Sequence, residues 1–343
     1  MTGDKRTLRA GVIGLGSMGL NHARVYAEIA GVELVAVADV SRERFALASA
    51  STNVGEDFSP PGATANTYPD YHRMLAEERL DLVSVCVPTL LHREVALAAI
   101  EKSVAVLVEK PIAATTDEGR AMAKASRAAG VPLMVGHVER FNPAVLEVKR
   151  RLAAGELGRV YQLYARRTGP FPQRVRDVGV VHDLAPHDID VMFFLLESEV
   201  EHVYAETLQG VATQHEDMLW GVLRFRCGAV GVLDVNWLTP TKVRQLSILG
   251  EKGLLQADYL SQQVSFYPKD RDGQSRDTAP QAIRVKSAEP LRLELEAFVD
   301  AVRRGVAPPV TAEDGLAALE TASLLVESAR TGRAMPLPAR RPA

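Results

Sequence analysis

Short, almost continuously apolar runs alternate with amphipathic segments along the first 137 residues of the chain. The runs are short and rich in β-branched residues, as strands are, and the segments between them carry apolar residues at helical spacings of three and four. Strands that are apolar on both faces and alternate with helices predict a doubly wound parallel sheet. The expected strands are 9–14, 33–39, 82–88, 104–110 and 132–137, and the expected helices are 22–30, 92–102 and 117–130.

A different pattern begins after Asn142. Consecutive strand-like runs are joined there by short turns, such as Arg226-Cys227-Gly228, which indicates an antiparallel meander. An open, mainly antiparallel sheet with helices on one side is an α+β arrangement. The polar tract Pro268–Gln281 is expected to form a long hairpin or lid. The expected strands are 159–167, 200–209, 217–226, 228–238, 244–251 and 253–260, and the expected helices are about 143–154, 183–196, 291–304 and 313–330.

The chain has 343 residues, and single hydrophobic cores seldom grow much beyond about 250 residues. We therefore expect two domains, residues 1–137 and residues 138–343, which together make an α/β plus α+β protein. The formal net charge is only −3 and the basic residues are scattered. This charge pattern predicts no general affinity for nucleic acid or for anionic lipid.

Two further observations bear on location. The N-terminal residues lack the apolar stretch of a signal peptide, and no later apolar run approaches membrane-spanning length, so no membrane partner is expected. Cys86 and Cys227 lie inside apolar, strand-like runs, which suits reduced, buried thiols better than a disulfide. Both observations favour a cytoplasmic protein.

A glycine-rich turn follows the first expected strand directly. In Gly14-x-Gly16-x-x-Gly19, the first glycine permits a tight turn, the second lets the backbone approach a pyrophosphate, and the third allows close helix packing. The N-terminus of the next helix would hold the anion. A turn that only joins a strand to a helix is the alternative. The residues expected to contact the cofactor here are Gly14, Gly16, Ser17, Met18 and Gly19.

Asp39 stands twenty residues beyond Gly19, at the end of the second expected strand. A carboxylate at this place can accept hydrogen bonds from both ribose hydroxyls and would repel a 2′-phosphate. Asp39 therefore favours NAD over NADP, although the nearby Arg42 weakens that preference. Strand, glycine turn, helix and acidic residue together predict a dinucleotide-binding Rossmann domain.

Three motifs carry a resemblance to a known family. They are Glu109-Lys110-Pro111, Pro88-Thr89-Leu90-Leu91-His92 and Asp183-Leu184-Ala185-Pro186-His187-Asp188-Ile189-Asp190. Through them the chain resembles the Gfo/Idh/MocA oxidoreductases over nearly its whole length. The resemblance implies that Lys110 contacts the reacting hydroxyl beside the nicotinamide and that Asp183 and His187 form a proton relay. It also implies that Pro88, Thr89, His92 and Glu109 lie at the cofactor.

The chemistry of the three catalytic candidates supports this assignment. Oxidation of an alcohol by NAD needs a base for the hydroxyl proton, and imidazole serves as one near neutral pH. Asp183 and His187 are four residues apart, so at the start of a helix they would share one face and the carboxylate could orient the ring. Lys110 would then polarise the substrate oxygen. The alternatives are a solvated charge pair at the Glu-Lys-Pro strand end and a surface position for His92.

The segment from His182 to Asp190 also gathers histidines and carboxylates. His182 and His187 are five residues apart rather than four, and no cysteine or third histidine is nearby. This spacing does not suit a zinc site, so no metal is expected, and Asp190 is expected to cap or brace the helix.

Four arginines stand within eleven residues, at positions 166, 167, 174 and 176. Arginine forks bind phosphates well, so this concentration suits a phosphate or diphosphate, although a solvated charged loop is an equal alternative. Segments 135–143, 166–172 and 177–180 resemble the branch of the family that oxidises UDP-N-acetylglucosamine at its 3-hydroxyl. That likeness implies that Arg166 and Arg167 face the diphosphate and that Arg140 and Asn142 lie near the sugar.

Other functions remain open from the sequence. A family member acting on myo-inositol or another free sugar would make the arginines incidental. A non-catalytic NAD(P)-sensing regulator would keep the dinucleotide fold but would have no need of Lys110, Asp183 and His187 together. The uncovered face of the second sheet would suit a homodimer or a homotetramer.

Overall fold

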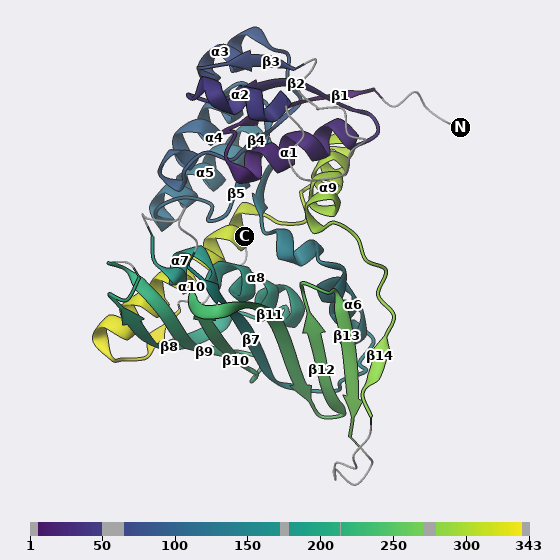
Figure 1. Cartoon of the computed structure of the whole chain (residues 1–343), viewed down its shortest axis with the longest axis vertical. Coiled ribbons are helices and arrows are strands. Elements are labelled where there is room, and N and C mark those ends of the chain that lie inside the picture. The colour runs from purple at the N-terminus through teal and green to yellow at the C-terminus, as the bar shows by residue number, and fades with distance from the viewer. Residues whose placement is uncertain (1–5, 50–64, 172–177, 213, 270–278, 338–343) are drawn as a thin grey trace. The chain divides into compact units, whose positions relative to one another are not determined.

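The computed structural model describes residues 6–49, 65–171, 178–212, 214–269 and 279–337. The chain forms two compact units (Figure 1). The first unit contains Met1–His137 and Leu291–Leu316, and the second contains Val138–Pro290 and Ala317–Ala343. Leu291–Leu316 thus groups with the dinucleotide-binding part, whereas the sequence analysis placed it in the second domain. The tract Pro268–Gln281, expected to be a hairpin or lid, lies largely outside the described residues.

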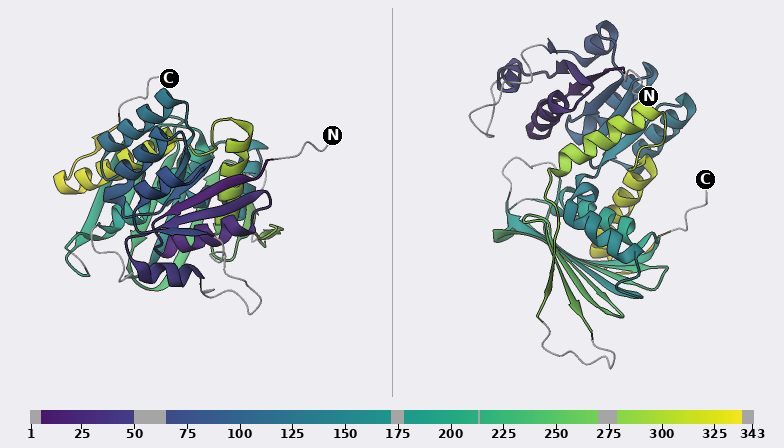
Figure 2. Two further views of the ribbon diagram at one scale, coloured as in Figure 1. Left: turned by 90° about the horizontal axis from the view of Figure 1, so that it is seen from above. Right: turned by 90° about the vertical axis from the view of Figure 1, so that its right-hand side faces the viewer.

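The first unit contains a six-stranded parallel sheet in the order β3-β2-β1-β4-β5-β6, with helices on both of its faces (Figure 2). The predicted doubly wound sheet is confirmed. Its central strands are buried because both faces are covered, as the continuous apolar runs required. The strands are β1 (Leu8–Ile13), β2 (Val32–Ala38), β3 (Asn66–Tyr68), β4 (Leu82–Val85), β5 (Ala105–Glu109) and β6 (Leu133–Gly136).

The helices of this unit have identifiable ends. In α5, Thr115 and Glu118 form a capping box at the start, and Gly130 adopts a left-handed conformation at the end. In α9, which comes from the C-terminal part of the chain, Arg292 pairs with Glu28 at 2.9 Å, which ties the helix to this unit. The helices are α1 (Ser17–Glu28), α2 (Arg42–Ser49), α3 (Tyr71–Glu77), α4 (His92–Glu101), α5 (Thr116–Ala129) and α9 (Pro290–Arg304).

The second unit contains a nine-stranded sheet in the order β14-β13-β12-β11-β7-β10-β9-β8-β15. The predicted open, mainly antiparallel sheet is confirmed, but the simple meander is wrong at one place. The chain passes from β10 to β11 across the end of β7, which lies between them and runs parallel to β10. The strands are β7 (Val160–Pro170), β8 (Val200–Gln209), β9 (Glu216–Phe225), β10 (Val230–Asn236), β11 (Leu238–Gly250), β12 (Gly253–Asp258), β13 (Gln263–Pro268), β14 (Gln281–Ile283) and β15 (Met335–Pro336).

Helices pack on one face of this sheet and bury Leu163, Ala165, Leu246 and Ile248 in the core of the unit. The helix expected over 183–196 is divided in two, because Pro186 has no N–H to continue the hydrogen-bonded ladder. No helix of the described ranges is both long and apolar enough to cross a membrane. The helices are α6 (Pro143–Ala153), α7 (Val180–Asp183), α8 (Ala185–Leu196) and, from Ala317 on, α10 (Ala312–Thr331).

Both cysteines are free thiols, as expected. The expectation that both are buried is wrong for Cys227, which lies exposed on the turn between β9 and β10. Turn residues reach the surface even when the runs on either side of them are apolar.

Candidate functional site

The glycine turn of the first unit fits a dinucleotide. Gly14 has φ +91°, and a Cβ atom there would lie 2.7 Å from the backbone of Cys86 and Val87. A Cβ atom on Gly19 would lie 1.8 Å from the carbonyl oxygen of Gly14, so the helix can approach the turn only if Gly19 has no side chain. A Cβ atom on Gly16, in contrast, would have no described heavy atom within 4 Å. The turn is therefore tight where packing requires it and open where a pyrophosphate would lie.

The start of α1 is suited to an anion. Gly16 is the N-cap, no described side chain caps the helix there, and its first turn carries no acidic residue. Backbone N–H groups of the first turn, including those at Ser17 and Met18, are thereby left for a ligand. The turn lies at the carboxyl end of β1, beside β4, where the strand order reverses. Open α/β sheets bind their ligands at such a switch point.

Asp39 holds this turn from the next strand. One of its carboxylate oxygens accepts the N–H of Leu15 at 2.6 Å, and the other accepts the N–H of Ser41 at 2.8 Å. Each oxygen keeps a second lone pair that a ribose hydroxyl could use. Asp39 thus has a structural role in the turn in addition to the ribose-binding role that the sequence predicts.

His92 braces the end of β4 against the Glu-Lys-Pro segment. Its side chain is buried, with Nδ1 2.9 Å from the carbonyl oxygen of Pro111 and Nε2 3.0 Å from that of Val87. Burial lowers the pKa of His92, and the hydrogen bonds to the two carbonyl groups act in the opposite direction. The alternative of a surface histidine is wrong. Pro88 and Thr89 lie between Val87 and His92, at the carboxyl end of β4.

Glu109 ends β5 and belongs to a buried hydrogen-bond network. Its Oε1 lies 3.0 Å from Nε2 of His22, whose Nδ1 lies 2.9 Å from the hydroxyl of Ser84, and this hydroxyl also bonds Tyr26. Burial favours the neutral acid, but the hydrogen bond and charge of His22 and the charge of Lys110 outweigh it and lower the pKa of Glu109. Glu109 is therefore an anion fixed beside the half-buried Lys110.

His22 was not among the site residues predicted from the sequence. Its signal was available, because His22 lies three residues after Gly19 on the buried face of α1. His22, Cys86 and Glu109 also bring three possible metal-ligand atoms within 4.8 Å of one another. Both ring nitrogens of His22 are already hydrogen-bonded, and burial raises the pKa of Cys86 well above its usual value, which disfavours the thiolate that a metal needs. Hydrogen bonding accounts for this cluster without an ion.

Asp183 and His187 lie on consecutive helices of the second unit. Asp183 is the last residue of α7 and is buried, and the half-buried His187 lies in the first turn of α8. The two residues therefore lie on consecutive helices that meet at Leu184, whereas the spacing predicted a single helix. Lys110 belongs to the first unit, so its action together with this pair is part of the function proposed below.

Besides Asp183 and His187, four residues of the second unit are expected to contact the substrate, and three of these four are engaged in buried interactions. Arg167 pairs with Asp188 through two hydrogen bonds of 2.7 and 3.1 Å and with Glu139 at 3.0 Å. Burial opposes the charge of Arg167, but the two carboxylates outweigh it and raise its pKa. Arg140 pairs with Asp190 at 2.7 and 2.6 Å, so Asp190 does brace α8.

Asn142 caps α6 by accepting the N–H of Ala144 at 3.1 Å, and it donates to the carbonyl oxygen of Tyr259 at 3.1 Å. Arg140, Asn142 and Arg167 thus have structural partners within the second unit, and their contact with a substrate stays a prediction.

Arg166 points to the opposite face of the sheet from Arg167, because successive residues of a strand alternate. It is exposed there and lies 3.3 Å from Asp234. Arg174 and Arg176 lie outside the described residues. The described part of the sheet therefore does not bring Arg166 and Arg167 together in one diphosphate site.

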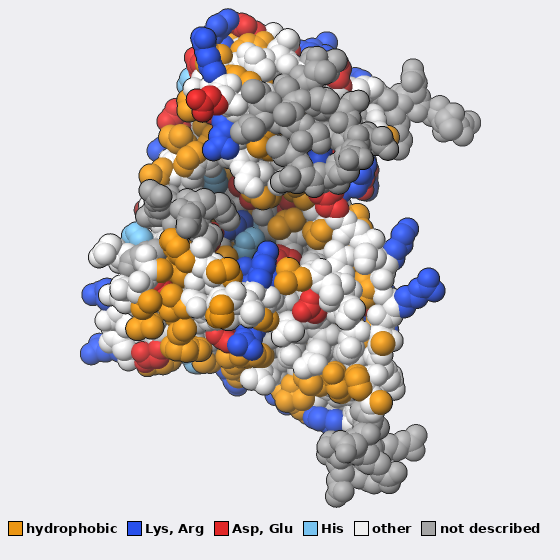
Figure 3. Space-filling view, viewed as in Figure 1, with side chains coloured by type: hydrophobic (Ala, Val, Ile, Leu, Met, Phe, Trp, Pro, Cys, Tyr) orange, Lys and Arg blue, Asp and Glu red, His pale blue; other side chains and the backbone are white. Residues whose placement is uncertain are grey.

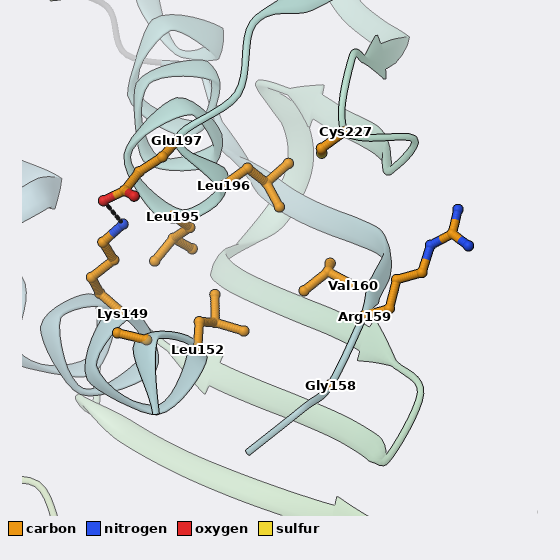
Figure 4. A pocket seen from close by; sticks show the side chains of 10 residues that line it. Lys149, Leu152, Gly158, Arg159, Val160, Leu195, Leu196, Glu197 and Cys227 are labelled. Atoms are coloured by element: carbon orange, nitrogen blue, oxygen red, sulfur yellow. Dashed lines mark hydrogen bonds and ion pairs between the residues drawn. The ribbon is translucent and has the colours of Figure 1, made fainter. Parts of the chain in front are cut away.

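A cavity of about 320 Å³ lies elsewhere in the second unit (Figure 4). Its rim carries the ion pair of Lys149 with Glu197 at 2.6 Å. None of the catalytic or substrate-binding candidates lines it, so it offers no chemistry for the reaction. Its apolar walls come from Leu152, Ala153, Val160, Leu195 and Leu196.

Two parts of the chain match family models. Residues 8–137 match the oxidoreductase family with an NAD-binding Rossmann fold, and residues 149–337 match the C-terminal alpha/beta domain of the same family. The chain belongs to the Gfo/Idh/MocA oxidoreductase family. The resemblance carried by the three sequence motifs is confirmed.

Relatives in this family act on different substrates. The chain is 28% identical to a UDP-N-acetylglucosamine 3-dehydrogenase of Acidithiobacillus ferrooxidans, over 86% of this chain and 88% of the relative. It is 27% identical to a scyllo-inositol 2-dehydrogenase (NAD(+)) of Bacillus subtilis, over 97% of both. A solved structure of the WlbA dehydrogenase from Bordetella pertussis, in complex with NADH and UDP-GlcNAcA, has a TM-score of 0.79 and 27% identity and covers 98% of this chain and 100% of its own.

The family fixes the class of reaction. The chain is an NAD(P)-dependent dehydrogenase acting on CH–OH groups, with NAD as its cofactor, rather than a non-catalytic sensor. The glycine turn of the first unit agrees with this cofactor.

Proposed function

We propose that this enzyme oxidises a sugar hydroxyl to a ketone with NAD, and that its substrate is UDP-N-acetylglucosamine, oxidised at the 3-hydroxyl. The observation that carries the proposal is the likeness to a UDP-N-acetylglucosamine 3-dehydrogenase over 86% of the chain. The similarity to a dehydrogenase solved with UDP-GlcNAcA supports the same substrate class.

In the proposed mechanism, His187 takes the hydroxyl proton and Asp183 stabilises the imidazolium that results. Lys110 donates a hydrogen bond to the substrate oxygen and steadies the charge that develops there. Glu109, held by His22, keeps a negative charge beside Lys110. When bound, NAD supplies an acceptor for the hydride that leaves the same carbon. One C–H bond and one O–H bond break, and the C–O bond becomes a carbonyl.

A substrate panel tests the proposal. With NAD present, UDP-N-acetylglucosamine should give NADH at a higher kcat/KM than myo-inositol, scyllo-inositol or free N-acetylglucosamine, as followed by NADH absorbance. The product should carry its ketone at the sugar C3 in an NMR spectrum. The second candidate is a free-polyol dehydrogenase, which the likeness to the Bacillus subtilis enzyme over 97% of the chain favours. A preference for either inositol would replace the nucleotide-sugar assignment with this one.

We also propose that the open face of the second unit's sheet joins two copies of the chain. Figure 3 shows hydrophobic side chains gathered over these strands. Tyr204, Val222 and Tyr164 are exposed, and Val222 pairs across the strands with Tyr204 on one side and with Val232 on the other, so the apolar patch is continuous. Trp220, half exposed, extends it. A self-complementary apolar sheet face suits a two-fold interface, and a tetramer could use the same contact twice.

Changing Trp220 to Glu should convert the oligomer to a monomer, because each interface would bury two new charges. Light scattering after size-exclusion chromatography measures the mass. Val306→Glu is the matched control, since Val306 is a similarly exposed apolar residue of the first unit, and this variant should keep the parental mass. A monomeric parent protein would disprove the interface.

We propose a cytoplasmic location for the enzyme, since both of its cysteines are free thiols.

A further inference from the structure

Arg244 lies on the helix-covered face of the second unit's sheet. It stands in β11 on the same side as the buried Leu246 and Ile248, and its cross-strand partner in β7 is Arg167. On the other side of β11, the N–H of Tyr259 donates to the carbonyl oxygen of Arg244 at 2.9 Å. Arg167 in β7, Arg244 in β11 and Tyr259 just after the end of β12 are therefore neighbours across the sheet.

The guanidinium of Arg244 has no carboxylate partner within ion-pair distance among the described residues, whereas Arg167 beside it has two. Its hydrogen bonds run from Nη1 to the carbonyl oxygens of Thr168 and Val243, both at 2.7 Å. Two carbonyl groups orient a guanidinium without neutralising it. The other donors of the fork therefore remain available to an anion.

The surroundings of Arg244 keep it charged at neutral pH. Burial and then the charge of Arg167 lower its pKa to about 10, and Asp188, Glu139 and Asp183 act in the opposite direction. Asp183, a member of the proposed catalytic pair, is thus among the carboxylates whose charge acts on Arg244. Gly169 of β7 lies beside this guanidinium, and a Cβ atom there would lie 3.9 Å from Nη1, at ordinary van der Waals distance.

Tyr259 provides a second, independent indication of a ligand. Its side chain is only 4% exposed, and its hydroxyl has no hydrogen-bond partner among the described residues. Its ring lies 5.6 Å from the guanidinium of Arg167. Burial raises the pKa of Tyr259 well above its usual value, so the hydroxyl remains a donor. Buried hydroxyls are nearly always hydrogen-bonded, which indicates that a ligand group or an ordered water meets this hydroxyl, in the residue whose backbone is bonded to Arg244.

We propose that Arg244 and Tyr259 form a subsite for an anionic group of the substrate, a phosphate or a carboxylate, and thereby select charged sugars over neutral polyols. This proposal rests on the proposed function, because it specifies which charged part of the sugar substrate the enzyme recognises. Arg244 is not one of the four arginines near position 170 that suggested an anion site in the sequence.

Binding of UDP and of glucuronate to the NADH-loaded enzyme, measured by calorimetry, tests the subsite without requiring turnover. Arg244→Met roughly keeps the length of the side chain and removes the charge. It should lower the affinity for the preferred anion by about tenfold to a hundredfold. Arg244→Lys should restore part of the affinity. Preference for UDP would identify a phosphate as the ligand, and preference for glucuronate would identify a carboxylate.

Two further variants separate recognition from folding. Tyr259→Phe should lower the affinity for the same anion by about threefold to tenfold. It should not lower the midpoint of thermal unfolding, because the lost hydroxyl has no described hydrogen-bond partner in the fold. Lys252→Met removes an exposed cation from the turn between β11 and β12, eight residues from Arg244, and should bind like the parent. Equal anion affinity in Arg244→Met and the parent, or no anion binding by the parent, would overturn the subsite. Failure to oxidise UDP-N-acetylglucosamine would overturn only the proposed substrate.

Discussion

Replacing His187 with alanine should lower kcat by about a hundredfold or more and leave the affinity for NADH nearly unchanged. The imidazole is the proposed acceptor of the hydroxyl proton, and a protein without it must pass that proton to water. The expected cofactor contacts lie in the first unit, whereas His187 lies in the second. Steady-state NADH formation gives kcat, and a fluorescence titration with NADH gives the affinity.

His182→Ala is the matched control for this experiment. His182 lies five residues earlier in the same segment, and burial lowers its pKa. Its Nε2 lies 3.4 Å from the hydroxyl of Ser323, and no catalytic role is proposed for it. Its loss should change kcat by no more than a few-fold. If His187→Ala turned over at the parental rate, or if both variants lost activity equally, His187 would not be the base.

The dinucleotide-binding fold could be predicted because its signals are local. Gly14 and Gly19 are required by contacts within the turn itself, and the continuous apolar runs follow from burial on both faces of the sheet. The second sheet could be predicted only as a class. The alternation of residues 159–167 cannot predict that this strand lies between β10 and β11. Alternation specifies which face of the sheet a side chain occupies, and it does not specify which strand lies beside it.

The site was predicted less completely than the fold. The local concentration of arginines led to the prediction that Arg166 and Arg167 bind the same phosphate group. Strand alternation alone, however, places adjacent side chains on opposite faces of the sheet. The pairing of Arg167 with Asp188 joins residues 21 positions apart, and no local pattern indicates it. Arg244 was missed for the same reason, since its importance depends on its cross-strand neighbour.

The buried pair of Arg167 and Asp188 should have a large effect on stability. Replacing Asp188 with alanine leaves the Arg167 guanidinium, whose side chain is only 4% exposed, with Glu139 as its one carboxylate partner. Removing one partner of a buried ion pair typically lowers the free energy of unfolding by about 3–5 kcal/mol, because the remaining charge stays desolvated. Urea denaturation of the purified protein, followed by circular dichroism, measures this loss.

Asp300→Ala provides the comparison, because Asp300 pairs with Arg304 on the exposed surface of α9. The Arg304 side chain is 64% exposed, so water can replace its partner, and the expected loss is about 1 kcal/mol or less. Each variant removes a carboxylate partner of one arginine, and burial is the main difference between the two pairs. An equal, small loss in both would show that Glu139 alone compensates Arg167. In that case, the role of Asp188 would be to orient α8 and not to balance the charge of Arg167.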